Sequence, residues 1–115
     1  MDDLWQQVDE LNALLTEELA RCRESGCQLA ENEAEYRKAL RIAILSERDK
    51  ATPVTIIGDV CRGREDIAEL KRARDCSEAI YKASGEAINV YKIRLRMLND
   101  QISRVWSSGG NGAFN

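Results

Sequence analysis

The stretch Ala-Thr-Pro-Val-Thr-Ile-Ile-Gly-Asp-Val-Cys-Arg-Gly, residues 51–63, decides the fold, because it holds the only proline of the chain and interrupts an otherwise helical pattern. Thr52 followed by Pro53 is typical of a helix N-cap with proline at the first helical position. Gly63 lies where a left-handed residue would end that helix. We therefore predict a short helix over about residues 53–62, with an extended conformation of its apolar residues as the alternative.

A long helical pattern precedes this connector. Apolar side chains recur at steps of three and four from about residue 3 to residue 50, which predicts one face of a long helix. Its members are Leu4, Val8, Leu11, Leu15, Leu19, Cys22, Leu29, Tyr36, Leu40 and Ile44. Asp2 or Asp3 is placed to cap the start of this helix. At Ser25-Gly26 we expect a tolerated glycine or a kink rather than a break, since a glycine within a helix costs about 1 kcal/mol relative to alanine.

A second helical pattern follows the connector, from about residue 64 to residue 106. Its later part alternates steps of three and four, which predicts a coiled-coil seam. The seam consists of Tyr81, Ser84, Ile88, Tyr91, Leu95, Leu98, Ile102 and Val105. Upstream lies a small-residue stripe made of Ala73, Cys76, Ala79, Ala83 and Ala87, with Ile80 among them. This stripe indicates either a place where more than two helices approach closely or simply the helix propensity of alanine.

The two patterns are about equally long, about 48 and about 43 residues, and at about 1.5 Å per residue each helix measures about 65–70 Å. Equal arms joined by a compact connector favour folding back, which brings Trp5 and Trp106 together at the open end. The distribution of charged residues along the chain also favours antiparallel helices. Residues 1–35 carry ten acids and two bases, whereas residues 36–115 carry fifteen bases and ten acids. The acidic start is then expected beside the late basic side chains Lys92, Arg94, Arg96 and Arg104.

Together these features predict an all-α fold, a long antiparallel helical hairpin of the coiled-coil type with a short connector helix. A single domain covers residues 1–106, with a helix over about 3–50, a connector over 51–63 and a helix over about 64–106. Residues 107–115, rich in glycine and serine, are predicted to form a flexible tail. Two helices cannot enclose a core, so we expect a homo-oligomeric bundle, a dimer or a tetramer, in which other copies cover the remaining apolar stripes.

Composition argues against several classes of function. The chain has no histidine, which excludes Ser/His/Asp and Cys/His catalysis, and it has no phosphate-binding loop motif. The four cysteines form no C-x-x-C pair, so we expect neither a metal site nor a cofactor, and a reducing cytoplasmic setting. No apolar run approaches the roughly 20 residues of a membrane span. Bases are interspersed with acids, which disfavours nucleic acid as a partner. We predict a protein without enzymatic activity.

The connector is the candidate binding site, because binding residues gather on ordered loops held by rigid elements. Its candidate ligand-binding residues are Thr52, Thr55, Gly58, Asp59, Arg62, Gly63 and Arg64. The start of the second long helix offers free backbone N–H groups, and the two arginines would reinforce an anion site there. The alternative is structural. The apolar connector residues would then plug the end of the bundle, and the arginines would pair with Asp59, Glu65 or Asp66.

The chain resembles a group of small helical proteins from phages and prophages of Gram-positive bacteria. The resemblance covers roughly residues 33 to 106. It lies in the stretches 35–41 (EYRKALR), 52–59 (TPVTIIGD) continuing to Arg62-Gly63, 67–71 (IAELK) and 86–90 (EAINV).

The resemblance implies an accessory role in the cytoplasm of an infected host bacterium, and two functions follow. In the first, the oligomer is a sponge that sequesters a phosphorylated immune signal, a cyclic nucleotide or an ADP-ribose-type molecule, in its connector. In the second, it is a coiled-coil protein–protein adaptor in phage recombination or replication.

Overall fold

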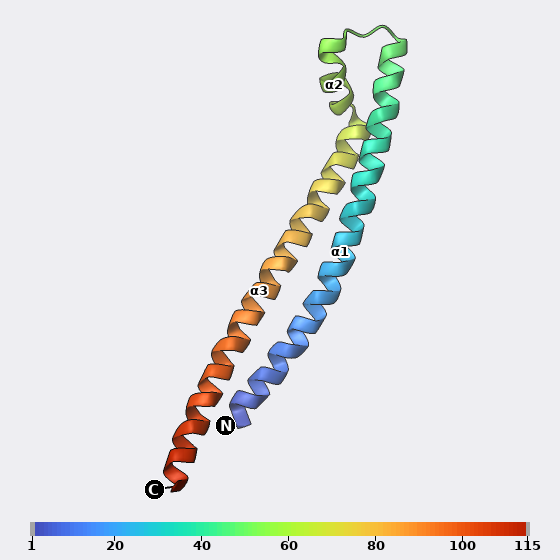
Figure 1. The fold of residues 1–115 in the computed structure, drawn as a ribbon. Helices are drawn as coiled ribbons and strands as arrows, with labels where there is room; N and C mark the ends of the chain where they lie inside the picture. The colour runs from blue at the N-terminus through green and yellow to red at the C-terminus, as the bar shows by residue number, and fades with distance from the viewer. Residues whose placement is uncertain (1, 115) are drawn as a thin grey trace. The chain divides into compact units, whose positions relative to one another are not determined.

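The structure is a computed structural model that describes the backbone of residues 2–114 and the side chains of residues 2–108. It contains three helices in chain order (Figure 1): α1 (Asp2–Asp49), α2 (Val54–Arg62) and α3 (Glu65–Phe114). No strand occurs in the described backbone. The predicted all-α class is confirmed, and the connector is helical, not extended. Among the described residues, no helix is long and apolar enough to cross a membrane.

The chain divides into two compact units. Unit one consists of Met1–Cys22 and Ala83–Asn115, and unit two consists of Arg23–Lys82. Within each unit the segment of α1 runs antiparallel to the segment of α3 beside it (Figure 1). The direction predicted for a hairpin is therefore present in both units.

Apolar side chains hold unit one together. Val8, Leu98 and Ile102 are buried, and the half-buried Leu4, Leu11 and Leu95 pack against them. Four residues of the predicted seam on α3 are buried: Ser84, Ile88, Leu98 and Ile102. Val105, at the end of the seam, is 46% exposed. Both tryptophans belong to this unit and are largely exposed, Trp5 at 52% and Trp106 at 74%.

The acidic start of α1 lies beside the late basic part of α3 in unit one, as expected, and Glu10 and Arg94 line one hollow, but close ion pairs are not formed between their described residues. Among the described residues, no ion pair links an acid of α1 to Lys92, Arg94, Arg96 or Arg104. The polar contact between the helices is instead a hydrogen bond of 2.9 Å from the Ser84 hydroxyl to the Glu18 carboxylate. Burial of the apolar seam stabilises this pairing more than exposed charges do, since each exposed pair contributes less than about 1 kcal/mol.

Unit two is closed by α2. Ala43 of α1, Ile57 and Cys61 of α2, and Ile67 of α3 are its buried cluster. The partly buried Tyr36, Ala39, Leu40 and Ile44 pack against this cluster. The short helix thus covers the apolar ends of two long helices, which gives unit two a core drawn from three elements.

Polar contacts also join α1 and α3 within unit two. The Asn32 amide donates a hydrogen bond of 2.6 Å to the Ser77 hydroxyl. The Arg74 guanidinium pairs with Glu33 at 2.5 Å and also with Glu78 and Asp75 on its own helix. Every buried side-chain nitrogen and oxygen of the described residues has a hydrogen-bond partner.

Helix α1 continues without interruption through Gly26, so the glycine does not break the helix, as expected. The ring of Tyr81 lies against it. A Cβ atom added to Gly26 would stand 3.0 Å from Cε2 of that ring. The glycine therefore admits a close approach of α3 to α1.

The ends of the connector helix differ from the prediction. Pro53 and not Thr52 is the N-cap, and no side chain caps α2. The Thr52 hydroxyl donates instead to the Glu47 carboxylate at 2.7 Å, which turns it toward α1. The predicted left-handed cap at Gly63 is also wrong. Its φ is −81°, because the chain passes from α2 to α3 through a right-handed residue. The left-handed residue is Ala51, with φ 61°, between α1 and α2.

Two further predictions concern the second helix. In the small-residue stripe, Ala73, Cys76, Ala79 and Ala83 are exposed and Ala87 is half-buried, so both interpretations of the stripe stay predictions. Helix α3 also extends past the predicted end near residue 106, through most of the range predicted as a tail. No proline follows Trp106 to interrupt the backbone hydrogen bonds of the helix.

Candidate functional site

The predicted connector site is built around arginines that pair with nearby acids. Arg62 lies 3.6 Å from Asp59 on the same helix. Its guanidinium also covers Gly58, since a Cβ atom added there would stand 3.0 Å from the arginine Nη1. Arg64 donates two hydrogen bonds, of 3.2 and 3.0 Å, to the two carboxylate oxygens of Asp66. The positive charge that would attract a phosphate is therefore compensated at both arginines.

The start of α3 is capped by its own acid. Asp66 accepts a hydrogen bond of 2.9 Å from the backbone N–H of Ile67. Hydrogen bonding to Arg64, followed by that to Ile67, lowers the pKa of this carboxyl. Glu65 adds a second acid to the first turn. Acids in the first turn of a helix interact with the same N–H groups and dipole that an anionic ligand would use.

The other predicted site residues are divided between core contacts and solvent. Thr52 is half-buried and hydrogen-bonded to Glu47, and this bond lowers the pKa of the glutamate. Thr55 and Gly63 are exposed. Ile57 and Cys61 are buried in the unit-two core, as the end-plug alternative requires. The remaining apolar residues of α2 are exposed: Val54 at 79%, Ile56 at 47% and Val60 at 40%.

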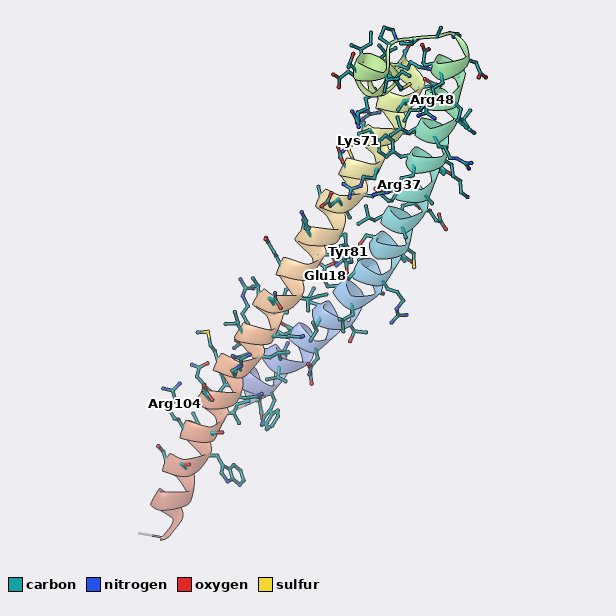
Figure 2. All side chains as sticks on the ribbon, turned by 45° about the horizontal axis from the view of Figure 1, so that its top comes forward. Glu18, Arg37, Arg48, Lys71, Tyr81 and Arg104 are labelled. Atoms are coloured by element: carbon teal, nitrogen blue, oxygen red, sulfur yellow. The ribbon has the colours of Figure 1, made fainter. Side chains whose placement is uncertain are left out.

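A second candidate surface, the basic face of unit two, lies on α1 and was missed from the sequence. It borders an open hollow of about 410 Å³ lined by Arg37, Leu40, Arg41, Ile44, Leu45 and Arg48. Figure 2 shows Arg37 and Arg48 on this helix. Arg37 pairs with Glu33 at 2.6 Å, whereas Arg41 and Arg48 have no ion-pair partner among the described residues. The signal in the sequence was the spacing of arginines four and seven residues apart beside leucine and isoleucine.

A third candidate surface, the acidic face of unit one, surrounds an open hollow of about 400 Å³. The hollow is lined by Gln7, Glu10, Leu11 and Leu14 of α1 and by Arg94, Met97, Leu98 and Gln101 of α3. Glu10 accepts a long hydrogen bond of 3.3 Å from Gln6 and forms no ion pair with a described residue. Glu17 lies two turns further along α1 and is exposed.

Helix α3 also leaves large apolar side chains in contact with solvent. Ile80 is 61% exposed, Val90 44%, Ile93 51% and Met97 62%. None of them belongs to the two buried clusters. In the part of the chain that the structure describes, no group of three or more histidine, cysteine or acidic side chains could hold a metal ion.

No family model, curated protein or solved structure matches this chain significantly.

Proposed function

We propose that the protein is a non-catalytic helical adaptor that works as a homo-oligomer and binds other proteins through its helices. The observation that carries the proposal is the exposure of Val90, Ile93 and Met97, which are three and four residues apart and so share one face of α3 in unit one. Solvent-exposed apolar surface of this kind marks protein–protein contacts. Fully burying an exposed side chain of this size contributes about 1.5–3 kcal/mol, and these half-exposed ones contribute part of it. Several of them together are needed to offset the freedom lost on association.

The adaptor is favoured over the nucleotide sponge by the state of the connector arginines. A phosphorylated ligand would have to replace Asp59 at Arg62 and Asp66 at Arg64. It would also meet the negative charge of those carboxylates and of Glu65 at the start of α3. The resemblance to phage proteins suggests recombination or replication as the setting of the adaptor.

Sedimentation equilibrium over a wide concentration range tests the proposal. We expect a mass of two or more times 13.0 kDa, the mass of one chain. Ile93→Lys should lower this mass at equal concentration, because a charge replaces an apolar side chain in the contact. Ile93→Leu is the matched control and should keep the wild-type mass. A single species of 13.0 kDa at every concentration would show the proposal to be wrong.

A thermal-shift titration with cyclic dinucleotides and cyclic ADP-ribose separates the two functions. If the protein is an adaptor, the midpoint temperature of unfolding should not change when either nucleotide is added. A rise that Arg62→Glu with Arg64→Glu abolishes, while the oligomer persists, would favour the sponge.

A further inference from the structure

The basic face of unit two carries charge without a partner beside apolar side chains. Residues 36–50 hold five bases and two acids. Arg41 and Arg48 are exposed and form no ion pair with a described residue, and Leu45 between them is 46% exposed. Ile44 and Leu45 line the hollow between these arginines. A face of this kind fits an acidic segment that also presents an apolar side chain.

The acidic face of unit one has that composition. Residues 2–20 hold six acids and no base. Glu10 and Glu17 are exposed without an ion pair to a described residue, and Leu14 between them is 40% exposed. Arg94 also lines this hollow and reduces its negative charge, but it forms no ion pair with a described acid.

The spacing of the two faces is the same. Glu10, Leu14 and Glu17 are separated by four and then three residues. The basic face has the same separations in both chain directions. From the C-terminal side they join Arg48, Ile44 and Arg41, and from the N-terminal side they join Arg41, Leu45 and Arg48. Two helix segments side by side, in either direction, therefore place each glutamate opposite an arginine and Leu14 opposite an apolar residue.

We propose that these two faces bind each other between copies: the acidic face of unit one in one copy docks on the basic face of unit two in another. The proposal rests on the proposed function, since it names a contact within the homo-oligomer. Each chain offers both faces, so every contact uses groups that one sequence already contains. Opposite charges across such a contact select the partner face and its register more than they add affinity.

Charge exchange between the faces tests the proposal. One variant carries Glu10→Lys and Glu17→Lys, and the other carries Arg41→Glu and Arg48→Glu. All four positions are exposed and helical, and lysine and glutamate have similar helix propensities, so circular dichroism should show unchanged helicity. Arg23→Glu with Arg104→Glu is the matched control, because it makes the same charge change as the second variant on exposed positions outside both faces.

We expect each variant alone to associate about tenfold more weakly or worse, because like charges then face each other. An equimolar mixture of the two variants should recover the wild-type mass, since every contact between unlike copies is again complementary. The control should keep the wild-type mass, and added salt should weaken wild-type association.

The outcomes separate the two proposals. A wild-type chain that stays at 13.0 kDa contradicts the proposed function itself. A wild-type oligomer whose mass neither charge variant changes contradicts this inference and leaves the proposed function standing. If, in addition, a glutamate-rich helical peptide binds the wild type but not the Arg41→Glu, Arg48→Glu variant, the basic face belongs to an acidic partner protein and the inference is wrong.

Discussion

Tyr81 and Gly26 show how single residues determine the separation of the two long helices in unit two. The ring of Tyr81 occupies the space that a methyl group on Gly26 would need. Glycine lowers the stability of helix α1 at this position, and the packing of α3 against Gly26 compensates for that loss. Gly85 of α3 provides the contrast, since a Cβ atom added there meets nothing within 4 Å.

Two glycine substitutions measure this difference. Gly85→Ala should raise the free energy of unfolding by about 1 kcal/mol, because alanine is the better helix former. Gly26→Ala should give a smaller gain or a loss, since the ring of Tyr81 has to move. Urea unfolding followed by circular dichroism measures both. Equal gains would contradict the role of the Tyr81 contact, and Gly26→Ala in a Tyr81→Ala background should recover the full gain.

Arg74 is the residue that joins the helices by charge. Hydrogen bonds from Arg37 and then from Arg74 hold the pKa of Glu33 below its usual range. The folded state therefore binds fewer protons at Glu33 than the unfolded state. This stabilisation is fully present above the ordinary glutamate pKa and is lost as the pH falls through the lowered one.

We expect Arg74→Met to destabilise the protein at neutral pH and to lose much of that effect in acid. Urea midpoints measured from neutral pH down to below the ordinary glutamate pKa show whether the curves of wild type and variant converge. Lys38→Met removes an exposed cation of the same unit and should leave the pH dependence nearly unchanged. Parallel curves for wild type and Arg74→Met would mean that Arg74 does not contribute through Glu33.

At the scale of the elements, α2 decides how unit two ends. Nine residues long and without a side-chain cap, this helix would be unstable alone, because isolated helices need about 12–15 residues. Packing compensates for this, since Ile57 and Cys61 are buried against α1 and α3 while Val54 faces solvent. The same packing explains why the connector is helical although its sequence also fits an extended segment.

Ile57→Ala should therefore lower the free energy of unfolding by about 2–4 kcal/mol, from the lost burial and the cavity left in the core. Val54→Ala removes two methyl groups from the same helix at a position that is 79% exposed. It should change stability by less than about 0.5 kcal/mol. Urea unfolding measures the free energy of unfolding of both variants. A similar loss of stability at the two positions would contradict an orientation of α2 that buries Ile57 and exposes Val54.

At the scale of the whole molecule, the proposed assembly rests on the balance of buried and exposed apolar groups. Eight hydrophobic residues are buried among the described residues, while fifteen large hydrophobic ones are exposed by 40% or more. Two clusters of three and four buried residues form the cores of the units. Cores this small give limited stability, and contacts between copies would add to it.

Unfolding of the wild type should accordingly depend on protein concentration. If folding is coupled to association, each tenfold increase in concentration stabilises a dimer by about 1.4 kcal/mol. The urea midpoint should rise across a concentration series, and the Arg41→Glu, Arg48→Glu variant should show a weaker rise. Coincident wild-type curves at all concentrations would indicate a monomer.

The sequence by itself determined the elements of this protein. Helical periodicity and one proline predicted three helices and the buried α3 positions of the seam, because backbone hydrogen bonds and apolar spacing are local properties. The antiparallel direction followed from the equal lengths of the two arms and the charge of the two halves. Only the tertiary structure decided the details at the connector and on the surface. Thr52 binds Glu47, and Ala51 takes the left-handed turn. Burial of Ile57 and Cys61 also agrees with the end-plug alternative, in which Arg62 and Arg64 pair with nearby acids. These depend on which groups meet when α2 closes over unit two, and spacing along the chain does not specify that.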